Sequence, residues 1–271
     1  MLDSLATVTK IQMDIDDYLR SAGEVFRAFR DQDSTRISYG VLSSDRRWFV
    51  NHSNHPRGLA SLERVYNLNM NVRHAALPRL SNRFETANGV ALVYDWVPSE
   101  KLYAGSRYSA ARLRVDLTIP RVRFWSSPVD DIVQSLNTIF DVQLKLADRG
   151  YVAVDLYDGC FIYDFDASRT YVFDLDEYRT GPFILDANRL PGSRRFMAPE
   201  EWNKGTIIDQ VTNVFTLGRT AAEFLGRGAT SVDAWMGTDR MRLVTPKATS
   251  ENRSVRHQSV REFVEDWKSV D

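Results

Sequence analysis

The strongest constraint on the fold is a change of residue pattern near Pro98. Before this residue, short apolar segments alternate with polar turns, and after it apolar residues recur mostly at helical spacing over longer stretches. The first pattern is typical of strands and the second of helices that pack along one face. We therefore expect a β-rich region in residues 1–97 and a mostly α-helical region in residues 98–271.

The first region contains signals for two hairpins. Its segments predict strands over residues 24–30, 36–42, 46–52, 77–86 and 90–97. A short polar turn, Ser43 to Asp45, joins two of them, and Asn88-Gly89 joins another two, because both residues of Asn-Gly tolerate positive φ. Apolar residues at helical spacing predict a helix between the hairpins, near residues 59–68.

The second region opens with a long helix. Ser127 is the expected N-cap and Pro128 suits the first turn, while Arg149-Gly150 is typical of a helix end. Two short apolar strands, 160–163 and 170–173, flank an acidic turn. Further helices are expected over 211–225 and 259–267.

Composition excludes several classes of protein. With 35 Lys and Arg against 36 Asp and Glu, the formal net charge is -1, so no basic excess favours binding to nucleic acid. No apolar run reaches the roughly 18–20 residues that span a bilayer. The single cysteine, Cys160, cannot form an internal disulfide, and no signal peptide is visible. We therefore expect a cytoplasmic protein without a membrane span and without a nucleic-acid partner.

Three acidic or polar motifs occur in a fixed order in the second region. They are VDLYDGCFIYD at 154–164, YVFDLD at 171–176 and GSRRFMAPE at 192–200. Taken singly, each is a weak signal, since acidic loops are often solvated turns. Their order and spacing give the signal its strength.

In this order the motifs resemble those of the protein-kinase-like superfamily. DLYDGCFIYD is similar to the catalytic loop and the strand after it, FDLD to the metal-binding DFG segment, and MAPE to the end of the activation segment. The stretches 208–218 and 256–267 resemble the helices that follow. The resemblance implies a bilobal α+β fold, with a small antiparallel β-rich N-lobe and a mostly α-helical C-lobe.

The resemblance also implies roles for the acidic residues. Asp155 matches the catalytic aspartate that orients an acceptor hydroxyl, and Asp174 matches the ligand of Mg²⁺ bound with ATP. Asp176 stands where the family has glycine and is a further candidate metal ligand. Cys160 occupies the place of a metal-binding asparagine, although a thiol is a soft, poor ligand for Mg²⁺. Its alternative role is a small buried residue beside a strand, and Asp158 could act on the metal through water.

The first region departs further from the family pattern. Asn51 stands where the family has a phosphate-binding lysine, so Glu63, the expected partner of that lysine, has no partner of this kind. The connection from residue 31 to 35 lacks the glycines of the family's phosphate loop. The segment Asp95-Trp96-Val97 falls at the hinge between lobes, where it would border an adenine pocket or simply pack.

Other positions match supporting residues of the family. Ser193 could hydrogen-bond Asp155, and Asn213 replaces an aspartate that braces the catalytic loop. Glu200 and Arg256 match a structural ion pair. Arg194 and Arg195 could hold an acidic acceptor or a phosphate, although a pair of adjacent arginines is more often part of a solvated loop.

Three functions are compatible with these matches, the first two almost equally favoured. The first is an atypical phosphotransferase that moves the γ-phosphate of MgATP to a hydroxyl, with protein Ser/Thr as the favoured acceptor. The second is a pseudokinase, a binding, scaffold or regulatory module with little or no catalysis, favoured by Asn51, Cys160 and the glycine-free loop. A third reading, a small-molecule phosphotransferase, rests on Asp158-Gly159.

Overall fold

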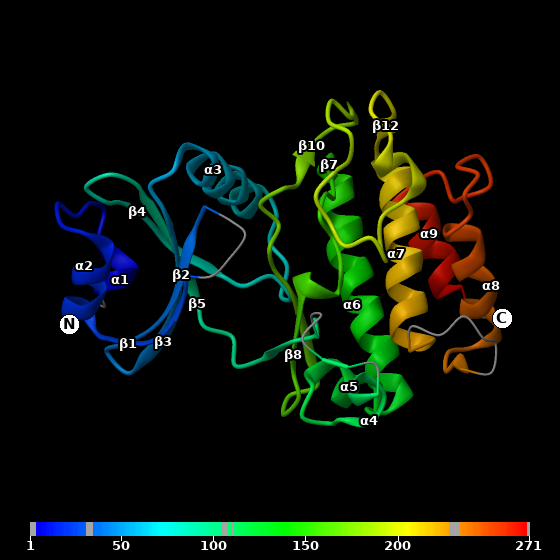
Figure 1. Cartoon of the computed structure of the whole chain (residues 1–271), viewed down its shortest axis with the longest axis horizontal. Coiled ribbons are helices and arrows are strands. Elements are labelled where there is room, and N and C mark those ends of the chain that lie inside the picture. Colours follow the sequence, from blue (N-terminus) through cyan, green and yellow to red (C-terminus); the bar gives the residue numbers. More distant parts are fainter. Residues whose placement is uncertain (1–3, 31–34, 105–107, 110, 228–233, 270–271) are drawn as a thin grey trace. The chain divides into compact units, whose positions relative to one another are not determined.

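The computed structural model describes residues 4–30, 35–104, 108–109, 111–227 and 234–269. The chain divides into two compact units, Met1–Pro98 and Ser99–Asp271 (Figure 1). The first is built around an antiparallel sheet and the second is largely helical, so the protein is of the α+β class. Most of the glycine-free connection, residues 31–34, lies outside the described residues.

An antiparallel five-stranded sheet forms the centre of the N-terminal unit. Its strands lie in the order β1-β2-β3-β5-β4. Their bounds are β1 Glu24–Phe29, β2 Ile37–Ser43, β3 Arg46–Ser53, β4 Leu80–Glu85 and β5 Val90–Asp95. The predicted turn between β2 and β3 is a two-residue turn at Ser44 and Asp45, both with positive φ (48° and 61°), as a tight hairpin requires.

Helices cover both faces of this sheet (Figure 1). The helix expected near residues 59–68 is longer, α3 Pro56–Asn71, and buries Leu62, Val65 and Leu68. The sequence patterns did not indicate α1 (Ser4–Thr7) or α2 (Ile15–Ala22). These helices bring apolar side chains such as Leu5 and Leu19 onto Tyr39, Trp48 and Phe84 in the core.

Four helices form the bulk of the C-terminal unit: α6 Val129–Asp148, α7 Gln210–Leu225, α8 Asp239–Ala248 and α9 Val260–Lys268. They lie side by side in Figure 1, and three of them were expected from the sequence. The expected cap of the first was wrong: α6 begins after Pro128, which provides no side-chain hydrogen bond, and not after Ser127. Acidic Asp130 and Asp131 in its first turn complement the helix dipole instead.

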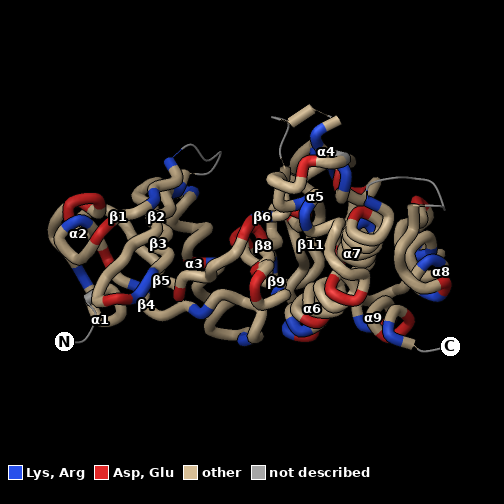
Figure 2. Tube along the Cα trace, turned by 90° about the horizontal axis from the view of Figure 1, so that it is seen from below, with Lys and Arg blue, Asp and Glu red and all other residues tan. Residues whose placement is uncertain are grey.

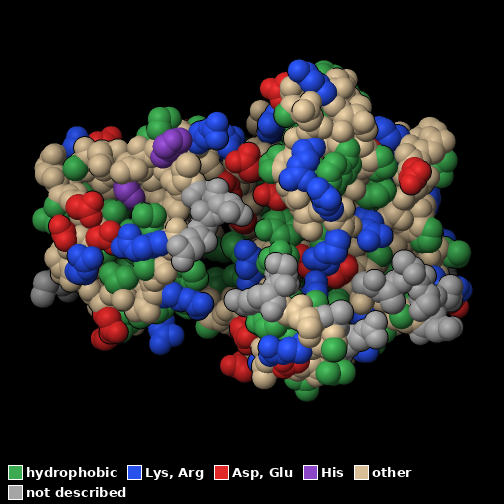
Figure 3. All heavy atoms as spheres, viewed as in Figure 1, with side chains coloured by type: hydrophobic (Ala, Val, Ile, Leu, Met, Phe, Trp, Pro, Cys, Tyr) green, Lys and Arg blue, Asp and Glu red, His purple; other side chains and the backbone are tan. Residues whose placement is uncertain are grey.

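A three-stranded sheet positions the acidic loops of this unit. It has the order β6-β8-β9, with β6 Glu100–Lys101, β8 Phe161–Asp164 and β9 Arg169–Val172. The remaining short elements are α4 Arg112–Val115, α5 Pro120–Trp125, β7 Tyr151–Val152, η1 Asp158–Cys160, β10 Arg179–Thr180, β11 Phe183–Ile184, η2 Pro199–Trp202 and β12 Ile207–Ile208. Within the described part of the chain, no helix is both long and apolar enough to cross a membrane. Charged side chains of both signs are spread over the face of the molecule shown in Figure 3.

Candidate functional site: an acidic cluster in the C-terminal unit

Asp155 lies in the loop that follows β7. The side chain of Asn213 on α7 fixes this loop from two sides: its Oδ1 accepts a hydrogen bond from the amide of Ala153 (2.8 Å) and its Nδ2 donates one to the carbonyl of Ala153 (2.9 Å). Both bonds are buried. The amide at position 213 therefore braces the loop, as the resemblance implied, and it does so through two bonds.

Asp174 lies in a second loop, directly after β9, and Cys160 joins the two loops. The thiol of Cys160 donates to the carbonyl oxygen of Asp155 (3.1 Å), and the carbonyl of Cys160 accepts from the amide of Phe173 (3.0 Å). Phe173 immediately precedes Asp174. Two loops that are 19 residues apart in sequence are thus held together within one unit (Figure 2 shows acidic positions beside β8 and β9).

Both aspartates have left-handed backbone conformations. Their φ angles are 60° at Asp155 and 63° at Asp174. At Ser44, Asp45 and Ser168, positive φ belongs to hairpin turns, but neither aspartate lies in a hairpin. Because such backbone strain costs free energy and clusters at functional sites, the conformation of these two loops favours a role for their carboxylates.

The carboxylates of this loop pair repel one another. Burial, first, and the charges of Asp174, Asp176 and Glu177 together raise the pKa of Asp155 to about 7, although Lys101 acts in the opposite direction. Interaction of this kind requires the groups to be near each other. We call Asp155, Asp174, Asp176 and Glu177 the acidic cluster; its repulsion would be relieved by a bound cation or by protonation.

The acidic cluster alone is not a complete metal cage. Among the described residues, no three His, Cys, Asp or Glu side chains are grouped so that they could hold a metal ion. Mg²⁺ commonly uses only one or two carboxylates and takes its other ligands from phosphates and water. Mutually repelling carboxylates therefore fit Mg²⁺ that arrives with a phosphate ligand.

Cys160 has a structural role and its thiol is not available as a metal ligand. The side chain is buried, and burial raises the pKa of its thiol well above the usual value. A neutral thiol that already donates to the Asp155 carbonyl is a poor ligand for a hard cation. Asp176, also buried, contributes charge to the cluster. Of the three candidate metal ligands, Asp174 and Asp176 remain in our proposed site.

Asp158 does not take part in the acidic cluster, which corrects the idea that it acts on a metal through water. Its Oδ2 accepts from Arg121 on α5 (3.2 Å) and from Arg195 (2.7 Å), and its side chain is fully buried. The same two arginines bind Oε1 of Glu223 on α7, at 3.4 and 2.6 Å. This network of four charges, buried except at the partly exposed Arg195, ties η1 to the segment that contains Arg195.

The segment around Ser193 borders the acidic cluster. Gly192 has φ 140°, and a Cβ placed on it would lie 3.6 Å from Oδ1 of Asp155, so this backbone passes close to the carboxylate. No hydrogen bond joins Ser193 to Asp155 in the described part of the chain. Arg195 is engaged in the buried network, and exposed Arg194 lies over the ring of Trp202 (5.6 Å).

The expected ion pair between Glu200 and Arg256 is present and buried. The two side chains meet twice, at 2.7 and 3.1 Å, and Arg253 adds a third contact to Glu200 at 2.6 Å. The neighbouring Glu201 is also buried. Burial raises the pKa of Glu201 to about 8, although its Oε2 accepts the amide of Ala198.

In the N-terminal unit, Glu63 has a different partner from the one the family would use. Arg83 on β4 lies 3.4 Å from it, and the sequence analysis missed this pair. Asn51 on β3 and Arg83 on β4 are both registered with Leu92 of β5, so they share one row across the sheet. The Oδ1 atom of Asn51 is buried without a hydrogen-bond partner.

The residues expected at the hinge lie at the end of β5 and directly after it. Oδ1 of Asp95 accepts from Ser81 (2.7 Å) and Arg46 (3.1 Å). Trp96 packs edge-on against Phe26, with ring centroids 5.0 Å apart, and Val97 follows it. Within this unit, Trp96 therefore has a packing role.

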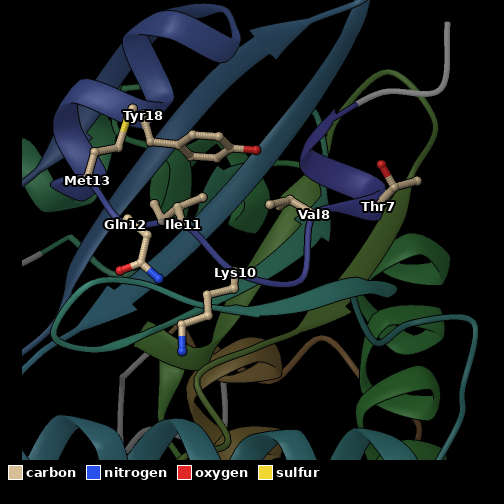
Figure 4. Close-up of a pocket in the computed structure, with 7 residues that line it drawn as sticks. All are labelled: Thr7, Val8, Lys10, Ile11, Gln12, Met13 and Tyr18. Carbon is tan, nitrogen blue, oxygen red and sulfur yellow. The ribbon is translucent and has the colours of Figure 1, made fainter.

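A groove of about 640 Å³ lies elsewhere in the N-terminal unit (Figure 4). It is lined mainly by apolar groups of one segment: Thr7, Val8, Lys10, Ile11, Gln12, Met13 and Tyr18. Because no carboxylate, histidine or cysteine is among the described residues that line it, this groove offers little for catalysis.

Comparisons with known proteins give no assignment for the chain. No protein-family model matches it, and a search of curated proteins finds no significant relative. The function must therefore be argued from the acidic cluster itself. Arg121, Glu223 and Lys101, which shape the surroundings of the cluster, could not be found by motif because each is far from the acidic loops in sequence.

Proposed function

We propose that the protein is an atypical, kinase-like phosphotransferase that acts in the acidic cluster of its C-terminal unit. The observation that carries the proposal is the pairing of Asp155 and Asp174 from separate, strained loops through Cys160. The order of the sequence motifs supports the same conclusion. We favour a Ser or Thr side chain of a protein as the acceptor, because the MAPE segment resembles the corresponding segment of protein kinases.

Asp155 would accept the proton of the acceptor hydroxyl. In the transfer, a bond forms between that hydroxyl oxygen and the γ-phosphorus, and the bond from the γ-phosphorus to the β–γ bridging oxygen breaks, leaving ADP. A carboxylate whose pKa lies near 7 suits proton transfer at neutral pH. Bound Mg²⁺ would supply charge neutralisation at the phosphates. Asp174, assisted by Asp176, would hold this ion.

A pseudokinase, which would bind the nucleotide or a protein partner without turnover, is the second candidate. It is favoured by the buried, unsatisfied Asn51 in place of a lysine, and by the use of Cys160 as a structural donor. Such a protein would keep the braced loops for recognition and lack an efficient phosphate grip.

Binding and transfer assays separate these functions. We expect MgATP to raise the thermal midpoint of the wild-type protein and ATP with a chelator to raise it much less, because ligand binding stabilises the folded state. Asp174→Asn should lose the magnesium-dependent shift. Asp155→Asn should keep it and lose phosphate transfer to a mixed Ser/Thr peptide substrate.

The matched control is Asp166→Asn, which removes one negative charge from an exposed turn of the same unit. This variant should behave as the wild type in both assays. A wild-type protein that binds MgATP but transfers no phosphate would favour the pseudokinase. Absence of any midpoint shift at millimolar MgATP would contradict the phosphotransferase and the nucleotide-binding form of the pseudokinase, and would leave only a module that binds a protein partner.

A further inference from the structure

Lys101 is a cation beside the acidic cluster that the mechanism above does not use. It lies on β6, the edge strand that pairs with β8, and is registered with Ile162. Its Nζ lies 5.2 Å from the ring centroid of Phe173, the residue before Asp174. β6 thus places this ammonium beside the second acidic loop, which contains Asp174.

The side chain of Lys101 is exposed, and among the described residues no carboxylate lies within ion-pairing distance of it. Other cations near the site differ in this respect. Arg121 and Arg195 are both held by Asp158 and Glu223. Because the arginines are committed to buried carboxylates, they cannot turn to a ligand without breaking the network, whereas Lys101 can.

The effect of Lys101 on neighbouring pKa values agrees with its position beside the acidic cluster. The charge of Lys101 lowers the pKa of both Asp155 and Cys160, so it acts on the same space as the acidic cluster. The ammonium itself lies over the face of the Phe173 ring, a cation–π contact, and the residue as a whole is exposed. This contact places the charge beside the loop that carries Asp174.

We propose that Lys101 binds the phosphates of the nucleotide, and so provides the cationic grip that Asn51 cannot provide. The inference rests on the proposed function and names the residue that recognises the polyphosphate. An ammonium is a common ligand for phosphate, acting as a point charge with three donors. Phe173 is a positioning residue in this arrangement, since its ring faces the ammonium of Lys101.

The test compares the binding of MgATP, adenosine and Mn²⁺ alone by calorimetry. Lys101→Met should weaken MgATP binding by about tenfold or more, as expected for loss of one charge-assisted contact. It should leave the affinity for adenosine unchanged, because adenosine carries no phosphate, and it should not weaken the binding of Mn²⁺, because loss of a positive charge beside the carboxylates favours a cation. Lys101→Arg, which keeps the charge, should bind MgATP within a few-fold of the wild type.

Lys145→Met is the matched control, since Lys145 is an exposed lysine on α6 of the same unit. It should bind all three ligands as the wild type does. Equal MgATP affinity in the wild type and Lys101→Met would overturn the role of Lys101 and leave the proposed function standing. Equal loss of MgATP and adenosine binding would also overturn it, since that pattern reports a general disturbance. Absence of MgATP binding by the wild type would overturn the proposed function and this inference together.

Discussion

Replacing Asp155 by asparagine should stabilise the protein at alkaline pH. The folded state holds the pKa of this carboxyl at about 7, against an ordinary value of 3.8, because of burial and the neighbouring carboxylates. The folded state therefore binds the proton more tightly than the unfolded state does. This contribution to stability is fully present below about pH 4 and is lost as pH rises through about 7.

The magnitude follows from the shift. Each pKa unit corresponds to about 1.4 kcal/mol, so the charged carboxylate costs up to about 4 kcal/mol of unfolding free energy at about pH 8. At about pH 5 the cost is about 1.5 kcal/mol by the same relation. We expect the difference between Asp155→Asn and the wild type to grow by about 2.5 kcal/mol over this range.

Urea unfolding at the two pH values measures this difference. Burial is the main cause of the raised pKa of Glu201, so most of its contribution is common to both proteins; the charge of Asp155 adds to that shift, so its removal lowers the pKa of Glu201 and increases the expected difference. Asp166→Asn controls for the change of net charge, and its unfolding free energy should follow that of the wild type at both pH values. If Asp155→Asn showed the same pH dependence as the wild type, the reasoning about a repelling acidic cluster would be refuted.

Other parts of the C-terminal unit give further expectations. Asn213→Ala should lower the unfolding free energy by about 2 kcal/mol in urea titrations and reduce phosphate transfer, because two buried backbone groups lose their partner; a variant as stable and active as the wild type would remove the brace from the account. Gly159→Ala should destabilise by about 1–3 kcal/mol, since the new Cβ would lie 2.2 Å from the ring of Tyr157; an unchanged thermal midpoint would contradict this. Arg256→Met should cost about 3 kcal/mol, the lower end of the range for a broken buried pair, because Glu200 loses two contacts but keeps the one from Arg253; a loss below about 1 kcal/mol in the same titrations would show that the pair is weakly coupled to stability.

Much of the fold followed from local patterns. Turn signals at Ser44-Asp45 and Asn88-Gly89, between short apolar segments, predicted both hairpins, because turn chemistry acts over a few residues. Ser44 and Asp45 have the expected positive φ, whereas Asn88 and Gly89 do not, so the second hairpin forms without the turn geometry that its sequence suggested. The helices α1 and α2 were missed because they are short and cover the sheet through tertiary contacts such as Leu19. Ser127 was a plausible cap by residue type, but the helix starts after Pro128.

The candidate site was only partly accessible from the sequence. Asp155 and Asp174 could be chosen because their motifs stand in a recognisable order. The destination of Asp158 could not be predicted, because its partners Arg121 and Arg195 approach from distant segments. Arg83 beside Glu63 was hidden for the same reason, since only the sheet register brings β4 next to α3 in space.

The account depends most on Asp155 and Asp174 sharing one site. The most direct measurement follows the Cγ chemical shift of Asp155 against pH by NMR, in the wild type and in Asp174→Asn. We predict a wild-type midpoint near pH 7, as the pKa of about 7 requires, and a lower midpoint once the charge at position 174 is removed. A wild-type midpoint near 3.8, or one that Asp174→Asn leaves in place, would show that the two carboxylates do not face each other.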